Sequence, residues 1–180
     1  YNGAGKQYYD NTALMYSGEF KDNLFHGTGE LYRQDGMKKY EGEFSGGFME
    51  GSGMLFDSGE NLVYTGTFLK DGIKYQELLG KDTTALAQMY TGSRKIYQSE
   101  GESCVIMPDI GAAYRSESGE DSLEEGWRVS GVYVFLDHLY IRGQLVEDIA
   151  SAKAFLGEPE YEGNTKAAMW DAVAIHEAIA

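Results

Sequence analysis

Cysteine and basic residues are scarce in this sequence, and each shortage excludes a class of protein. With Cys104 as the only cysteine among 180 residues, neither an intrachain disulfide nor a cysteine-rich zinc site can hold the fold together. Lys and Arg number 15 against 29 Asp and Glu, which gives a net charge of −14. Nucleic-acid binding gains most of its affinity from basic side chains, so we expect no nucleic-acid partner.

Long apolar runs are also missing. No stretch approaches the roughly 18 to 20 consecutive apolar residues that a membrane-spanning helix needs, and the first residues lack the basic and apolar regions of a signal peptide. The sequence therefore predicts neither feature within these residues and leaves the cellular compartment open. Glycine and tyrosine, in contrast, are abundant, with 24 and 14 copies, whereas proline occurs twice.

Glycines and aromatic residues recur at an offset of 24 positions through about the first 75 residues. Self-similarity at a fixed period indicates a repeat array. Residues 1–15 match the second half of a unit, so we expect further units upstream of Tyr1. The register ends after Asp71-Gly72, because Tyr75 and Glu77 stand where the next glycines are expected. The recurring positions are Tyr16, Tyr40 and Tyr64; Gly18, Gly42 and Gly66; Phe20, Phe44 and Phe68; Gly27 and Gly51; Gly29 and Gly53; Tyr32 and Phe56.

Each unit has the pattern of a β-hairpin. In Tyr16-Ser-Gly18-Glu-Phe20 the aromatic and small residues alternate with polar ones, which predicts a strand with one preferred face, and residues 27–32 predict a second strand. Residues 21–26 contain turn formers, and the pair Asp35-Gly36 suits a left-handed hairpin turn. Glycine normally weakens a strand, so its recurrence predicts aromatic rings lying across bare backbone. A bulky residue at Gly18 or Gly42 should obstruct that packing.

The pattern Tyr-x-Gly-x-Phe, six further residues and Gly-x-Gly resembles the MORN (membrane occupation and recognition nexus) repeat over residues 1–75. Complete units occupy residues 16–39 and 40–63. The resemblance implies an extended, twisted antiparallel β-meander with an aromatic-lined groove, used as a scaffold for protein binding or self-association. Lipid binding is also ascribed to the family, but residues 1–75 hold 7 Lys and Arg against 11 Asp and Glu, so membrane lipid is a disfavoured partner.

The repeating aromatic rings allow two interpretations. A one-layer sheet has no second layer to bury its rings, so rings stacked over glycines could be its core. The rings could also line a binding groove, since exposed aromatic stripes are typical of protein-binding surfaces. Both interpretations stay open at this point. The candidate groove residues are Tyr16, Phe20, Tyr32, Tyr40, Phe44, Phe56, Tyr64 and Phe68, and the candidate structural glycines are Gly18, Gly27, Gly29, Gly42, Gly51, Gly53 and Gly66.

Residues 76–180 predict a small α+β domain. Residues 82–90 predict a short helix with Asp82 or Thr83 as its N-cap, ended by Gly92. Further helices are predicted from Val146 to Leu156 and from Lys166 to Ala180, the last with a strand as the alternative. The apolar runs 103–107, 111–114, 127–135 and 138–141 predict an antiparallel sheet.

Two short stretches of this region, Leu79-Gly80 and 143–159, resemble β-lactamase-inhibitor-protein-like binding modules, which implies binding rather than catalysis. The predicted fold class is mainly β with an α+β C-terminal part. An extended antiparallel β-hairpin array over residues 1–75 is expected to be capped by the small acidic domain over residues 76–180. Repeat arrays expose an unpaired last strand that something must cover.

No pattern in the sequence supports catalysis. The acidic residues within 117–125 lack the spacing of a calcium loop, and His26, His138 and His176 lack the spacing of a zinc site. Cys104 lies in an apolar run, which favours a buried thiol over a nucleophile. Nucleophilic-serine, phosphate-binding and dinucleotide-binding motifs are absent. We therefore expect a protein without metal or cofactor that is not an enzyme.

The expected function is that of a non-catalytic scaffold or protein-interaction module. Residues 76–180 carry 8 Lys and Arg against 18 Asp and Glu, so a partner protein with a basic surface would suit them. A homo-oligomer is a further possibility. The alternatives are a small-ligand-binding or enzymatic C-terminal domain with the repeats as accessory, and recruitment to a membrane surface by the repeats.

Overall fold

The computed structural model describes residues 1–99, 102–117, 129, 131–134, 140–141, 144–145, 153, 161–162 and 168–169. The chain divides into two compact units. One comprises Tyr1–Ile73 and Met89–Gly92, and the other comprises Lys74–Gln88 and Ser93–Ala180.

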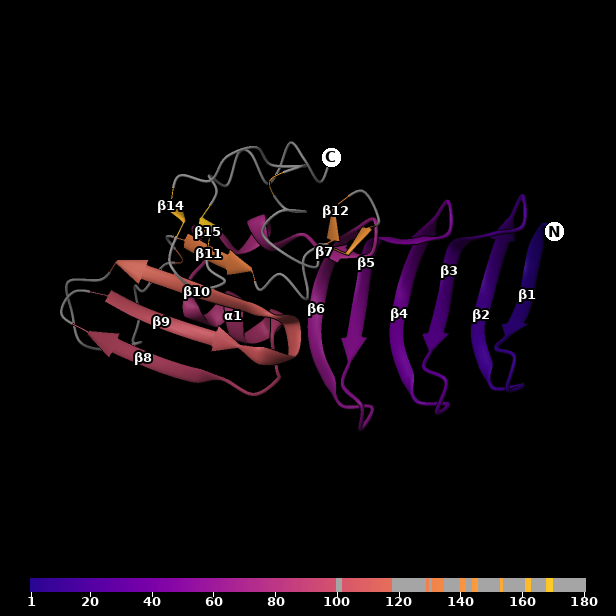
Figure 1. Cartoon of the computed structure of the whole chain (residues 1–180), viewed down its shortest axis with the longest axis horizontal. Coiled ribbons are helices and arrows are strands. Elements are labelled where there is room, and N and C mark those ends of the chain that lie inside the picture. The colour runs from indigo at the N-terminus through magenta and orange to yellow at the C-terminus, as the bar shows by residue number, and fades with distance from the viewer. Residues whose placement is uncertain are drawn as a thin grey trace. The chain divides into compact units, whose positions relative to one another are not determined.

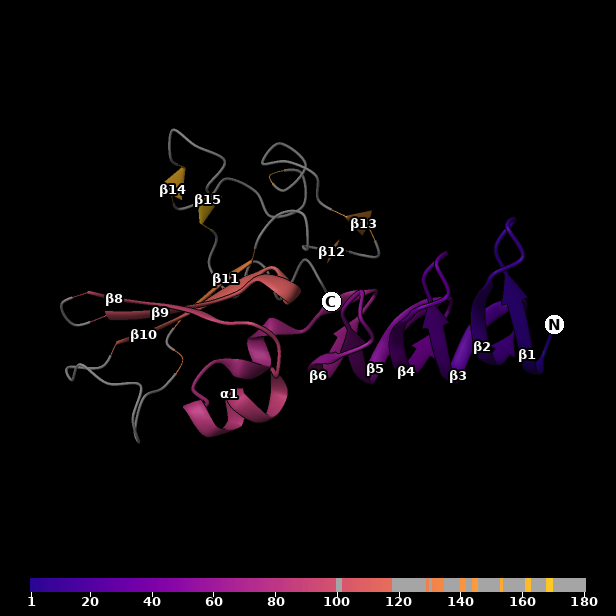
Figure 2. The same cartoon turned by 90° about the horizontal axis from the view of Figure 1, so that it is seen from below.

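The first unit is a single antiparallel sheet of seven strands that lie side by side in chain order (Figures 1 and 2). The strands pair as consecutive hairpins, which confirms the predicted hairpin array. Their bounds are β1 (Gly3–Tyr8), β2 (Leu14–Lys21), β3 (Leu24–Tyr32), β4 (Lys38–Ser45), β5 (Phe48–Phe56), β6 (Leu62–Leu69) and β7 (Gly72–Ile73).

Tight turns at the hairpin ends require the left-handed backbone region. Two successive residues with positive φ connect β2 to β3, at Asp22 (53°) and Asn23 (68°), as two-residue hairpin loops of type I′ demand. The equivalent pairs 24 and 48 residues later, Gly46-Gly47 and Lys70-Asp71, also have positive φ. At the other end of the hairpins, Gly36 has φ 89° but Asp35 does not have a positive φ, so the Asp-Gly pair lies in a longer loop between Tyr32 and Lys38 and not in the predicted two-residue left-handed turn.

A row of glycines crosses the sheet from β1 to β6. The paired positions are Gly5 with Gly18, Gly18 with Gly29, Gly29 with Gly42, Gly42 with Gly53, and Gly53 with Gly66. Tyrosine rings occupy the space that side chains at this row would need. A Cβ on Gly18 would lie 2.5 Å from the Tyr16 hydroxyl, and a Cβ on Gly42 would lie 2.5 Å from the Tyr40 hydroxyl. The glycine row is therefore a steric requirement of the tyrosine packing.

The aromatic rings form the core of the sheet by packing on one another. Tyr16, Tyr40 and Tyr64 have no exposed surface. The Tyr40 ring meets the Phe44 ring edge-on at 5.2 Å between centroids and the Phe68 ring at 4.8 Å, arrangements that aromatic quadrupoles favour. Burial raises the pKa of Tyr16 to about 12, so its hydroxyl stays protonated and donates a hydrogen bond to the Glu19 carbonyl at 2.9 Å.

Hydrogen bonds that recur with the repeat tie each hairpin to the next. The backbone N–H groups of Asn23, Gly47 and Asp71 donate to the carbonyls of Tyr1, Phe25 and Met49, respectively, at 3.0 to 3.1 Å.

Side chains make the corresponding tie at the other end of the hairpins. The Tyr9 hydroxyl donates to the Tyr32 carbonyl at 2.7 Å, and the Arg33 guanidinium, one unit later, donates to the Phe56 carbonyl at 2.5 Å. The next equivalent residue is Asp57, whose carboxylate can only accept, so this tie ends where the array ends.

The outer edge of β6 is covered, as the last strand of an array requires. Ile73 of β7 pairs with Phe68, and Tyr90 forms an antiparallel bridge with Tyr64. Thr91 then donates from its N–H to the Val63 carbonyl at 3.0 Å and from its hydroxyl to the Leu62 carbonyl at 2.6 Å. Residues 72–73 and 89–92 thus supply the cover within the first unit.

The second unit contains one described α-helix and several strands. Helix α1 (Thr83–Met89) begins after Asp82, whose Oδ1 accepts a hydrogen bond from the N–H of Ala85 at 2.9 Å, so Asp82 is the predicted N-cap. The helix ends one residue before Tyr90, which is extended because it bridges to β6. The other elements are the 3-10 helices η1 (Tyr75–Leu78) and η2 (Pro108–Ile110) and the strands β8 (Lys95–Ser99), β9 (Glu102–Met107), β10 (Ala112–Glu117), β11 (Gly131–Val134), β12 (Tyr140–Ile141), β13 (Gln144–Leu145), β14 (Tyr161–Glu162) and β15 (Ala168–Met169).

The predicted antiparallel sheet is present, with two differences. Strands β8 to β11 form a four-stranded sheet of order β11-β10-β9-β8, and β8 was not predicted because residues 95–99 form no apolar run. The run 138–141, expected in the same sheet, contributes β12, which pairs with β13 in a separate two-stranded ladder.

The two C-terminal helix predictions fall mostly outside the described residues. Lys153 is helical, as predicted for 146–156. Ala168–Met169 form a strand paired with β14, so the predicted helix from Lys166 is wrong at these two residues and the alternative of a strand is right there. The remaining residues of both segments are not described, and the same holds for the acidic residues from Glu120 to Glu125.

Replacing Asp71 by Asn tests the cost of burying this turn carboxylate. Burial raises the pKa of Asp71, while its Oδ1 accepts a hydrogen bond from the Met49 N–H at 2.8 Å. A raised folded-state pKa means that the ionised form destabilises the fold above that pKa and that the penalty disappears as the pH falls below it. Asn keeps the acceptor, and Asn23 already occupies the equivalent position with φ 68°.

We expect Asp71→Asn to raise the free energy of unfolding at pH 7 by about 0.5 to 1 kcal/mol, a figure reduced for partial solvent screening. The gain should vanish towards about pH 4, the ordinary range of an aspartate. Urea denaturation at both pH values measures it, with Asp22→Asn at an exposed turn as the control. A variant less stable than the parent at pH 7 would contradict the prediction.

Candidate functional site

The structure divides the eight predicted groove residues between the core and a partly exposed edge. Six of them are at most 8% exposed and belong to the aromatic core: Tyr16, Phe20, Tyr40, Phe44, Tyr64 and Phe68. Tyr32 and Phe56 are half-buried. A ring that its neighbours cover offers no surface to a ligand, so the six rings act as the core that the sequence left as one of two interpretations.

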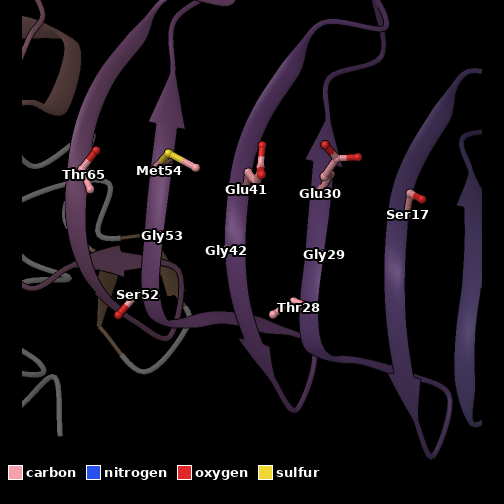
Figure 3. A pocket seen from close by; sticks show the side chains of 10 residues that line it. All are labelled: Ser17, Thr28, Gly29, Glu30, Glu41, Gly42, Ser52, Gly53, Met54 and Thr65. Carbon is pink, nitrogen blue, oxygen red and sulfur yellow. The ribbon is translucent and has the colours of Figure 1, made fainter.

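An open groove lies among side chains that alternate along the strands with the buried rings. Figure 3 shows the residues that line it. Its volume is about 600 Å³. The lining residues come from five strands, β2 to β6: Ser17, Thr28, Gly29, Glu30, Glu41, Gly42, Ser52, Gly53, Met54 and Thr65.

Strand register arranges the groove in three parallel rows (Figure 3). Ser17 pairs with Glu30, Glu30 with Glu41, Glu41 with Met54, and Met54 with Thr65, which makes one row of side chains across five strands. The lined part of the glycine row, Gly29, Gly42 and Gly53, runs beside it, and Thr28 and Ser52 stand on the far side. Bare backbone therefore separates two rows of side chains that are polar except for Met54.

A lysine joins the two glutamates of the groove. Lys38 Nζ lies 2.5 Å from Glu30 Oε1 and 2.8 Å from Glu41 Oε2. The Tyr32 hydroxyl donates to the other oxygen of Glu30 at 2.7 Å, and the lysine lies over the Phe56 ring, 5.7 Å from its centroid. Tyr32 and Phe56, the two predicted groove residues outside the core, thus support charged groups of the groove.

The charge pairing shifts the pKa values of this cluster. Hydrogen bonds from Lys38 and then from Tyr32 lower the pKa of Glu30. The same bond to Glu30, followed by the bond to Glu41, raises the pKa of Lys38. Glu30 and Lys38 are therefore both charged at neutral pH.

Two further glutamates are held in equivalent positions one unit apart. Glu19 Oε1 accepts hydrogen bonds from the N–H and the hydroxyl of Thr28, both at 3.1 Å. Glu43 Oε2 accepts a hydrogen bond from the Ser52 N–H at 2.6 Å. Gly27 and Gly51 have φ of 59° and 99°, and a Cβ at either would collide with the neighbouring carboxylate. Gly27 and Gly51, both predicted as structural glycines, therefore leave the space that the carboxylates of Glu19 and Glu43 occupy.

The described part of the chain offers no metal centre and no spanning helix. No group of three or more His, Cys, Asp or Glu residues is arranged there to hold a metal ion. Among the same residues, none of the helices is long and apolar enough to cross a bilayer.

Two consecutive stretches of the hairpin array, residues 16–38 and 40–60, match a family model. Both match the MORN repeat. The first stretch contains most of β2 and all of β3, and the second contains most of β4 and all of β5, so each matched stretch corresponds to one hairpin. A search of curated proteins found no match. The resemblance of residues 79–80 and 143–159 to β-lactamase-inhibitor-protein-like modules has no support from these comparisons.

Sequence reasoning missed the polar residues of the groove between the recurring MORN positions. Period-two alternation places Ser17, Glu41 and Thr65 on the face opposite the rings, but it does not say which face is open. The available signal was the repetition of glutamate at 19 and 43, next to the glycines at 18 and 42.

Replacing Lys38 by Met tests the charge cluster of the groove. Removal of the ammonium takes away the largest cause of the lowered Glu30 pKa, so that pKa should rise towards its ordinary value, while the Tyr32 hydrogen bond keeps part of the lowering. Carboxyl-carbon NMR during a pH titration measures it, with the exposed Lys21→Met as a control that should leave Glu30 unchanged. An unchanged Glu30 pKa in Lys38→Met would contradict the pairing.

Proposed function

We propose that this protein is a non-catalytic interaction module whose MORN units bind a partner protein through the polar groove. The observation that carries the proposal is the groove itself. Its polar side chains stand in register on five paired strands, and its charged groups are held before any partner arrives. The side chains of the site therefore lose little conformational entropy when a partner binds.

The MORN match supports an interaction role at a general level. A repeat array exposes an extended surface that grows with each unit, and such surfaces suit macromolecular partners better than small molecules. The groove lies on strands rather than loops, so its residues are fixed by the sheet.

Charge favours a protein over a membrane as that partner. Four glutamates, at positions 19, 30, 41 and 43, stand in or beside the groove, and Lys38 offsets one of them. Anionic lipid headgroups would be repelled by the remaining charge. A protein segment that carries positive side chains fits it.

Filling the groove with cationic side chains tests the proposal. Ser52→Arg with Thr65→Arg replaces two exposed groove residues, and Ser45→Arg with Ser58→Arg adds the same charge at exposed positions outside the groove. We expect proteins captured from an extract of the source cells to be lost with the groove variant and retained by the control, as quantified by mass spectrometry.

Circular dichroism and urea denaturation should give similar stabilities for both variants. Loss of capture by the groove variant can then not be explained by unfolding. Capture of the same proteins in equal amounts by the two variants would remove the groove from the proposed function.

A further inference from the structure

We propose that the groove binds an extended segment in the polyproline II conformation that carries basic residues at every third position. This inference rests on the proposed function and names the class of segment that the groove accepts. Three features of the groove lead to it: the state of its backbone, the spacing of its carboxylates and its length.

The backbone of the groove floor belongs to strands that are already paired on both sides. Gly29, Gly42 and Gly53 lie on strands that pair on both sides, so their main-chain groups face neighbouring strands within the sheet. A segment lying on this floor across the strands cannot add to the sheet as another strand. Its own main chain must stay solvated, and polyproline II is the extended conformation that needs no main-chain partners.

Two carboxylates beside the groove repeat at the spacing of this conformation. Glu19 on β2 and Glu43 on β4 occupy equivalent positions two strands apart, which corresponds to about 10 Å at the usual strand spacing. Three residues of polyproline II advance about 9.3 Å and complete one turn, so every third side chain points the same way. Lysine or arginine side chains three residues apart therefore meet both carboxylates.

Each carboxylate is fixed and keeps one oxygen for a partner. Glu19 uses Oε1 for Thr28, and Glu43 uses Oε2 for Ser52, while their other oxygens accept no hydrogen bond from the described residues. Both glutamates are exposed. Glu41, in the opposite row, binds Lys38 through Oε2 alone among the described residues, and so offers a third acceptor across the glycine floor.

The length of the groove suits a short segment. Its lining runs from Ser17 on β2 to Thr65 on β6, four strand spacings or about 19 Å. A polyproline II segment of about six residues covers that length and contains two turns. Two basic positions, one per turn, are what Glu19 and Glu43 can receive.

Two peptides of equal composition test the spacing. One has the sequence Lys-Pro-Pro four times, so each lysine is the third residue after the previous one. The other also has four lysines and eight prolines, but its successive lysines stand at i, i+2, i+6 and i+8, so no two lysines are three residues apart. Both form polyproline II, but only the first presents its lysines on one side. Fluorescence anisotropy with the full 180-residue chain measures their affinities at low and physiological salt.

We expect the evenly spaced peptide to bind about tenfold more tightly than its permuted form, with both affinities falling as salt rises. Glu19→Gln with Glu43→Gln keeps the acceptors for the Thr28 and Ser52 N–H groups and removes two charges. It should abolish the preference. Asp10→Asn with Asp22→Asn removes the same charge from exposed turns and should retain the preference.

Equal binding of the two peptides, or a preference that survives in the double glutamine variant, would overturn this inference. Self-association of the chain that the same variant abolishes would assign the groove to a second copy and also overturn it. If the arginine-filled variant loses its captured proteins while the peptides bind equally, the proposed function stands and the class of segment is wrong. If neither experiment depends on the groove, both proposals fail.

Discussion

The contact on which the sheet depends is a tyrosine ring lying on the glycine backbone of the neighbouring strand. A single-layer sheet has no second layer against which to bury apolar side chains. Here the rings of Tyr16 and Tyr40 occupy the space above Gly29 and Gly53, where any Cβ would collide with them. Their hydroxyls donate to the carbonyls of Glu19 and Glu43, which satisfies the polar end of each buried ring. Ring and glycine are thus one packing unit, repeated every 24 residues.

This packing gives the two sets of side chains different roles. Residues that alternate with the rings are free to be polar, and the strand register sets them in rows across β2 to β6. The rigid hairpins fix those rows, and charge pairs such as Lys38 with Glu30 fix the orientation of single groups. The groove is therefore built on the same strands and the same register as the core.

The sequence predicts the array well because several signals agree within each unit. The 24-residue register, the alternation around Gly18 and the Asp35-Gly36 turn all indicate a hairpin, and the structure has it. Whether the rings line a groove or form the core stayed open in the sequence, because alternation reveals two faces without showing which one its neighbours cover. The bridge of Tyr90 to Tyr64 and the strand at 95–99 depend on tertiary pairing, for which local sequence gives no signal.

A double-mutant cycle at Tyr40 and Gly53 tests the central claim most directly, because it measures the coupling between the ring and the bare backbone beneath it. The free energy of unfolding is needed for Gly53→Ala, Tyr40→Leu and the double variant. If the ring rests on the glycine, Gly53→Ala costs about 1 to 3 kcal/mol with Tyr40 present and clearly less once the ring is replaced. Additive effects of the two substitutions would contradict the account.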